Sequence, residues 1–103
     1  MASSQVTVLA MFKAKSGLEE RVREELLKLV APTRSESGCI NYDLHQCSDD
    51  KTKFMLHENW VSKRDLDIHL EMPYLNHFKS IAGEILAEPL QITIWKMISS
   101  KTR

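Results

Sequence analysis

The residues best suited to chemistry in this sequence are a histidine and a glutamate near the middle of the chain. Glu58 and Trp60 alternate along an expected strand, so their side chains lie on one side of it. His69 follows nine residues after Trp60, on an expected short helix. A carboxyl and an imidazole that share an apolar slot have shifted pKa values and can exchange protons with a substrate. The spacing suggests acid–base chemistry or substrate anchoring; the alternative is a surface histidine and a glutamate paired with a neighbouring arginine.

Several aromatic side chains could shape such a slot, although each is more commonly a core residue. Trp60, Tyr42 and Phe78 fall on the apolar faces of expected strands and helices. Tyr74 directly follows Pro73 at an expected helix start, where its hydroxyl could point into a cleft.

The histidines and cysteines do not form a metal-binding pattern. His69 and His77 are eight residues apart across a proline, and no Cys-x-x-Cys or His-x-x-x-His pair occurs, so no metal is predicted. Cys39 and Cys47 lie on one expected strand, about 26 Å apart at roughly 3.3 Å per residue, too far for a disulfide. Two free thiols and a reducing compartment are expected. A Cys–His nucleophile is the rarer alternative to a structural thiol.

Hydrophobic periodicity predicts four strands and three helical segments. The strands are expected at 5–13, 39–48, 53–61 and 90–98, and the helices at 18–31, 62–71 and 74–86. Ser16 and Ser62 are expected helix N-caps, and Pro73 is expected to open the last helix. Pro32 is expected to end the first helix.

This order of elements is typical of the ferredoxin-like α+β fold, a βαββαβ chain with an antiparallel sheet and helices on one face. One domain is expected at 5–98. The second and third strands form a hairpin in which two apolar faces should match: Ile40, Tyr42 and Leu44 with Phe54, Leu56, Glu58 and Trp60. The alternative register would place Asn41, Asp43 and His45 beside Glu58 and Trp60, and it buries more polar groups.

The sheet face that points away from the helices is expected to be apolar. It carries the apolar residues Leu9, Met11, Met55, Val61, Trp95 and Met97. Open to water, this row would be an unusually large apolar patch. We therefore expect a homodimer that packs sheet against sheet.

Length and charge exclude several classes of protein. The chain has 103 residues, which is one domain, and 14 basic residues balance 14 acidic ones. A net charge of zero argues against binding to nucleic acid or to an anionic membrane. No signal peptide, long apolar run or glycine-rich nucleotide fingerprint occurs, so a soluble cytoplasmic protein is expected.

An ordered set of residues carries a family resemblance. The set is Gly38-Cys39, Tyr42-Asp43-Leu44, the turn aspartates Asp49 and Asp50, Phe54, Glu58-x-Trp60, Leu66 and His69. In this order the residues resemble the antibiotic biosynthesis monooxygenase family, particularly its small quinol-monooxygenase-like members. The resemblance covers about residues 5 to 98.

The resemblance implies a dimeric α+β barrel with a pocket between sheet and helices. It also implies oxidation of a small quinol or polyphenol by dioxygen without a cofactor, because a deprotonated, electron-rich ring can itself reduce oxygen. His69 and Glu58 match the positions that the resemblance implies should face the pocket, and they are the expected catalytic residues. The substrate contacts implied or expected beside them are Trp60, Tyr74, Phe78, Asn41 and Tyr42.

Two other functions stay open at this point. A cofactor-free isomerase of a small, phosphorylated carbonyl compound would use His69 and Glu58 as a proton shuttle, with Lys63, Arg64 or Lys79 near the phosphate. A non-catalytic dimeric ligand-binding module would need neither proton transfer nor oxygen. Haem degradation is disfavoured, because the asparagine that haem-degrading relatives carry on the first strand is missing at 10–12.

Overall fold

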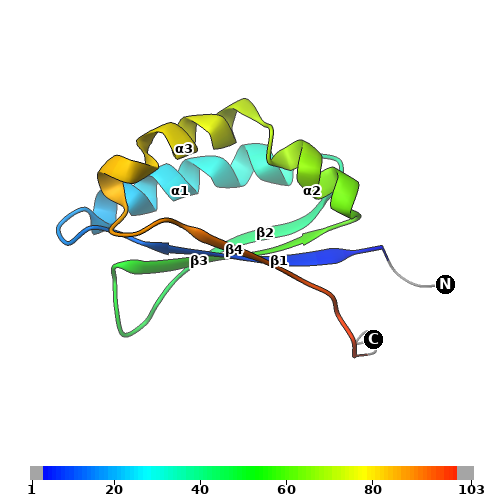
Figure 1. Ribbon diagram of the computed structural model, residues 1–103, viewed down its shortest axis with the longest axis horizontal. Coiled ribbons are helices and arrows are strands. Elements are labelled where there is room, and N and C mark those ends of the chain that lie inside the picture. The colour runs from blue at the N-terminus through cyan, green and yellow to red at the C-terminus, as the bar shows by residue number, and fades with distance from the viewer. Residues whose placement is uncertain (1–3, 100–103) are drawn as a thin grey trace.

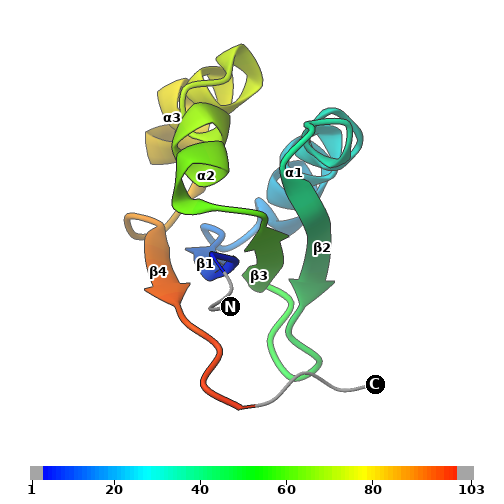
Figure 2. The same cartoon turned by 90° about the vertical axis from the view of Figure 1, so that its right-hand side faces the viewer.

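The computed structural model describes residues 4–99 and contains seven regular elements (Figure 1). They are β1 Val6–Lys13, α1 Glu19–Arg34, β2 Cys39–Gln46, β3 Lys53–Trp60, α2 Lys63–His69, α3 Pro73–Ile85 and β4 Gln91–Trp95. The four strands form one antiparallel sheet in the order β2-β3-β1-β4. All three helices lie over the same face of this sheet (Figure 2). The predicted ferredoxin-like α+β fold is confirmed.

The core lies between the sheet and the helices. Its buried apolar side chains come from the inward faces of β1 and β3, from Tyr42 on β2, and from α1, α2 and α3: Val8, Ala10, Phe12, Val22, Leu26, Leu29, Tyr42, Phe54, Leu56, Trp60, Leu66, Phe78 and Ile85. Strict alternation along β1 and β3 places every second residue in this layer. The same alternation therefore decides which polar side chains reach the interior.

The hairpin of β2 and β3 has the predicted apolar register. Tyr42 pairs with Glu58, and Leu44 pairs with Leu56. The prediction that Ile40 faces the core is wrong, since its side chain is 51% exposed. A bulge between Cys39 and Asn41 takes Ile40 out of the alternation.

The ends of α1 differ from the prediction. Ser16 is not the N-cap, because the helix begins at Glu19 with Leu18 in the cap position. Pro32 does not end the helix but lies inside its last turn, and the helix continues to Arg34. A proline beyond the first turn removes one backbone donor and crowds the carbonyl four residues earlier, but α1 continues for only two residues after Pro32 and is held by its contacts with β2 and α3. Ser62 caps α2 and Pro73 opens α3, as predicted.

The last strand is shorter and more exposed than expected. It covers Gln91–Trp95 instead of 90–98, and within residues 4–99 its one partner strand is β1. Ile92 and Ile94 lie on the helix side of the sheet, opposite Ala10 and Val8, yet both are exposed. The helices therefore do not reach over this edge of the sheet.

Cys39 and Cys47 are both free thiols, and burial raises the pKa of Cys39 to about 11. Within residues 4–99, no helix has the length and apolar character needed to cross a membrane.

Candidate active site

His69 is the centre of the site. Its side chain is 2% exposed, and Nδ1 lies 2.8 Å from Oε2 of Glu36, which comes from the turn between α1 and β2. The Tyr74 hydroxyl on α3 donates a hydrogen bond to the same Oε2. One nearly buried carboxylate thus joins α2 and α3 to the turn that begins β2.

Aromatic rings enclose the imidazole. The Trp60 ring lies 4.5 Å from the His69 ring, centroid to centroid, with the planes tilted by 33°. Tyr42 meets the imidazole edge to face at 5.5 Å. Packed in this way, the His69 ring has little freedom to rotate and little contact with water.

A tight contact positions the helix that carries His69. The Ser62 hydroxyl accepts a hydrogen bond from the Asp65 backbone N–H at 3.2 Å, which fixes the start of α2. The Asp65 side chain packs directly against Gly38, where an added Cβ would lie 2.2 Å from its Cγ. Val61 N–H also donates to the Gly38 carbonyl at 2.9 Å. Only a glycine at this position lets α2 approach so closely.

Glu58 is the second ionisable group. It is 4% exposed, and Oε1 accepts a hydrogen bond of 2.9 Å from Nε1 of Trp60. Burial raises its pKa to about 7; the Trp60 bond opposes this rise and the negative charge of Glu36 adds to it. Within residues 4–99, no cation forms an ion pair with Glu58. This carboxyl therefore changes its protonation near neutral pH.

The His69 imidazole is neutral at physiological pH. Burial lowers its pKa below the usual 6.5, the contact with Glu36 raises it, and the Lys79 ammonium lowers it further, so that the net direction is down. Because Nδ1 donates to the Glu36 carboxylate, Nε2 carries the lone pair. The arrangement is suited to accepting a proton at Nε2.

Both groups line one cavity of about 50 Å³ between the sheet and the helices. Its deep walls are buried and otherwise apolar: Val8, Ala10, Phe12, Leu29, Leu56, Leu66 and Phe78. Its rim consists of the less buried Leu70, Leu75, Lys79, Leu90 and Ile92. The volume is about a third of the roughly 150 Å³ in which benzene binds inside a protein. A ring can enter only if the rim side chains move apart.

The structure brings together six of the seven residues predicted for the site. His69, Glu58 and Phe78 line the cavity, Trp60 and Tyr42 pack against His69, and Tyr74 contacts Glu36.

Asn41 lies on the opposite face of the sheet. There its Oδ1 accepts a hydrogen bond from Nδ2 of Asn59 at 2.9 Å, and its Nδ2 donates to the His57 carbonyl. Successive residues of a strand alternate between faces, so Asn41 and its neighbour Tyr42 cannot both reach the cavity.

Glu36 is the residue that sequence reasoning missed. It lies in a turn, outside any periodic pattern, and 33 residues separate it from His69. An acidic residue in a turn is ordinary, so nothing local marks it as functional.

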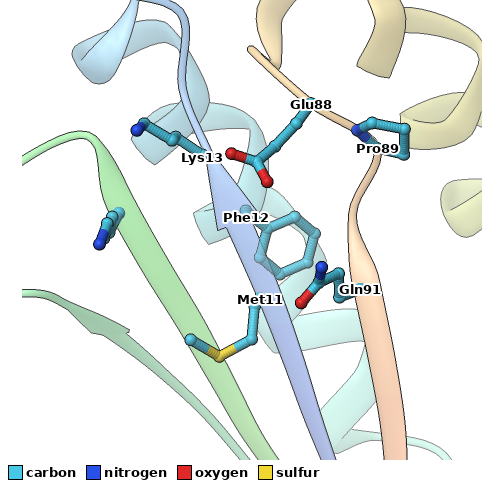
Figure 3. Close-up of a pocket in the computed structure, with 7 residues that line it drawn as sticks. Met11, Phe12, Lys13, Glu88, Pro89 and Gln91 are labelled. Atoms are coloured by element: carbon cyan, nitrogen blue, oxygen red, sulfur yellow. The ribbon is translucent and has the colours of Figure 1, made fainter.

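A second hollow, of about 250 Å³, lies where β1 ends and β4 begins (Figure 3). Its lining residues are Met11, Phe12, Lys13, Lys53, Glu88, Pro89 and Gln91. It has no imidazole and no buried carboxyl, so we place no chemistry there. Within residues 4–99, no group of three or more His, Cys, Asp or Glu side chains is arranged to hold a metal ion.

Comparison with known proteins identifies the family. The sequence profile of the family described as "Antibiotic biosynthesis monooxygenase" matches residues 5–80. The chain belongs to this family. The matched region contains Glu36, Glu58, Trp60, His69 and Tyr74, and so nearly the whole site is part of the family domain.

Individual relatives agree with this assignment. The Mycobacterium tuberculosis protein named "Putative monooxygenase Rv0793" is 33% identical over 89% of this chain and 90% of its own length. Its solved structure has a TM-score of 0.89 and covers 96% of this chain and 100% of that one. PA3566 from Pseudomonas aeruginosa, 30% identical, also has a TM-score of 0.89, with 96% and 99% covered. The antibiotic biosynthesis monooxygenase fold is thus shared along nearly the full chain.

Proposed function

We propose that this protein is a cofactor-independent monooxygenase that oxidises a small quinol or polyphenol with dioxygen. The observation that carries the proposal is His69, a neutral imidazole packed against Trp60 and held by Glu36 at the wall of an apolar cavity. Such an imidazole accepts a proton in a site with little water. The family membership, and the name of the Mycobacterium tuberculosis relative, favour a monooxygenase over other chemistry on this fold.

The residues divide the work between proton transfer and orientation. The substrate hydroxyl donates its proton to Nε2 of His69, while Glu36 holds Nδ1 and stabilises the imidazolium that forms. Glu58, with a pKa near 7, is partly protonated and donates a hydrogen bond to the second oxygen of the substrate. The deprotonated ring is then electron-rich enough to reduce dioxygen directly.

The electrons and atoms balance without a further reductant. A hydroquinone and one dioxygen give one hydroxyquinone and one water. The ring supplies four electrons, two as the quinol becomes a quinone and two as one ring C–H becomes C–OH. One oxygen atom forms the new carbon–oxygen bond, and the O–O bond breaks to release the other as water.

Oxygen uptake with a panel of reduced quinols tests the proposal. We expect saturable uptake above the autoxidation of the quinol, and a drop in kcat/KM of about a hundredfold or more in His69→Ala. His77→Ala is the matched control, since His77 is exposed on α3 and does not line the cavity. Oxygen uptake equal to autoxidation for every quinol would overturn the proposed monooxygenase activity. The isomerase and the ligand-binding module would then be the remaining hypotheses.

We also propose that the outer sheet face packs against a second copy of the chain. Met11 is 44% exposed and Trp95 is 53% exposed on that face. Beside them, Asn59 accepts a hydrogen bond from Thr7 and donates one to Asn41, which gives the face a polar strip. Sedimentation at micromolar concentration tests this: a dimer that Trp95→Asp converts to a monomer supports it, and a wild-type monomer excludes it.

A further inference from the structure

Lys79 is a cation at the entrance of the cavity. It follows Leu75 by one helical turn on α3, and both residues belong to the rim. Its Nζ donates to the Leu70 carbonyl at 3.3 Å, directly after His69 at the end of α2. The ammonium therefore stands beside the opening, close to the imidazole but on the solvent side.

The Lys79 ammonium has hydrogen-bond donors available for a ligand. An ammonium has three donors, and among residues 4–99 the Leu70 carbonyl is the one hydrogen-bond partner of Lys79. Most other cations on the helices are paired, for example Lys63 with Asp67 at 2.5 Å and Arg34 with Asp43 at 2.9 Å. In the part of the chain that the structure describes, no carboxylate lies within 4 Å of Lys79.

The acidic and basic groups of the cavity lie at different depths. Glu58 lies in the interior and Lys79 lies at the rim. A carboxylate or phosphate placed inside would lose its hydration beside the Glu58 carboxyl, which forms no ion pair within residues 4–99, and this loss is costly in an apolar cavity. The same group at the rim would meet Lys79 and stay half hydrated. A substrate with a hydroxyl and an anionic substituent therefore has one favourable orientation.

We propose that Lys79 binds an anionic substituent, a carboxylate or a phosphate, on a single-ring hydroxylated substrate. This rests on the proposed function for its ring chemistry, and it narrows the substrate class from any small quinol to acidic ones. The hydroxyl points inward to His69, the ring lies between Leu75 and Ile92, and the anion stays at the entrance.

Anaerobic binding measurements test the proposal without requiring turnover. The probes are 2,5-dihydroxybenzoate, its methyl ester and 4-hydroxyphenyl phosphate, titrated into wild type, Lys79→Gln and Lys79→Glu and followed by NMR. Arg64→Gln is the matched control, because Arg64 is an exposed cation on α2 that forms no ion pair within the described residues 4–99 and does not line the cavity.

We expect wild type to bind the acid about five-fold more tightly than the ester, the ratio that corresponds to roughly 1 kcal/mol for a half-exposed pair. Lys79→Gln should remove this preference, Lys79→Glu should reverse it, and Arg64→Gln should keep it. If 4-hydroxyphenyl phosphate binds more tightly than 2,5-dihydroxybenzoate, the anionic substituent of the substrate is a phosphate and not a carboxylate.

Equal affinities for acid and ester in wild type, or a preference that survives Lys79→Gln, would overturn the proposal. Oxygen uptake separates it from the proposed function. If the ester and the acid bind alike and both are oxidised, only the role of Lys79 fails. If the acid binds through Lys79 and none of the phenols is oxidised, the monooxygenase fails and the anion site stands.

Discussion

The raised pKa of Glu58 makes a quantitative prediction about stability. In the folded protein its pKa is about 7, against an ordinary value of 4.5. The folded state therefore binds this proton more tightly than the unfolded state. The resulting stabilisation is fully present below pH 4.5 and is lost as the pH rises through about 7. At 1.36 kcal/mol per pH unit, the difference between the two pKa values corresponds to about 3 kcal/mol.

Glu58→Gln should remove this dependence. Glutamine keeps the size of the side chain and an oxygen that accepts the Trp60 Nε1–H bond, but it carries no charge. Relative to wild type, we expect the variant to gain up to about 3 kcal/mol in the free energy of unfolding at pH 8. At pH 4 both proteins have a neutral group at this position, so their stabilities should nearly coincide.

Urea unfolding between pH 4 and pH 8, at one protein concentration, measures this difference. Glu25→Gln is the matched control. Burial favours the neutral form of Glu25, but the hydrogen bond from Arg21 and the charge of Lys28 outweigh it, and its pKa is lowered. The charged form of Glu25 therefore stabilises the folded protein, and Glu25→Gln should be less stable than wild type above pH 4.5. The stability difference between Glu58→Gln and wild type could instead be constant across this pH range, or it could favour wild type at pH 8. Either result would refute the conclusion that burial raises the pKa of Glu58.

The remaining predictions concern the parts that hold His69. Glu36→Gln should lower kcat for the proposed oxidation by about tenfold or more, because an amide can face Nδ1 with its NH₂ group and favour the wrong tautomer of His69. The rate of oxygen uptake measures kcat, and an unchanged thermal unfolding curve shows that the variant is folded. An unchanged kcat would exclude Glu36 as a positioning residue. Gly38→Ala should destabilise the protein by about 1–3 kcal/mol in urea, because its Cβ would overlap Asp65. Gly83→Ala, in α3 with no atom within 4 Å of the added Cβ, should instead stabilise it by about 0.5–1 kcal/mol; equal effects would argue against the Gly38 contact.

Local patterns in the chain were sufficient to predict most of the elements. Alternation along residues 5–13 and 53–61 identified β1 and β3 and their inward faces, because the period of a strand depends only on the chain itself. Ser62 and Pro73 marked helix starts correctly, since a cap and an N1 proline act on their own backbone. The same alternation placed Glu58 and Trp60 together, and it already separated Asn41 from Tyr42.

Where an element depends on its neighbours, the prediction was less accurate. The bulge that exposes Ile40 arises from pairing with β3, and Pro32 stays helical while α1 packs along β2 and α3. Neither outcome follows from the residues beside it, because the packing of a whole helix or strand outweighs a local preference, even the roughly 3 kcal/mol that disfavours proline inside a helix.

The sequence by itself determined the α+β fold, the inward faces of the strands, and the presence of a glutamate, a tryptophan and a histidine that could meet. The tertiary structure decided how they meet. It brought Glu36 from a distant turn to His69, and it placed Lys79 at the entrance of the cavity. It also buried Glu58 without an ion pair to any cation in the described part of the chain. These contacts join residues that are far apart along the chain. Their energies depend on burial and on the charges around them, which exist only once the sheet and helices have packed.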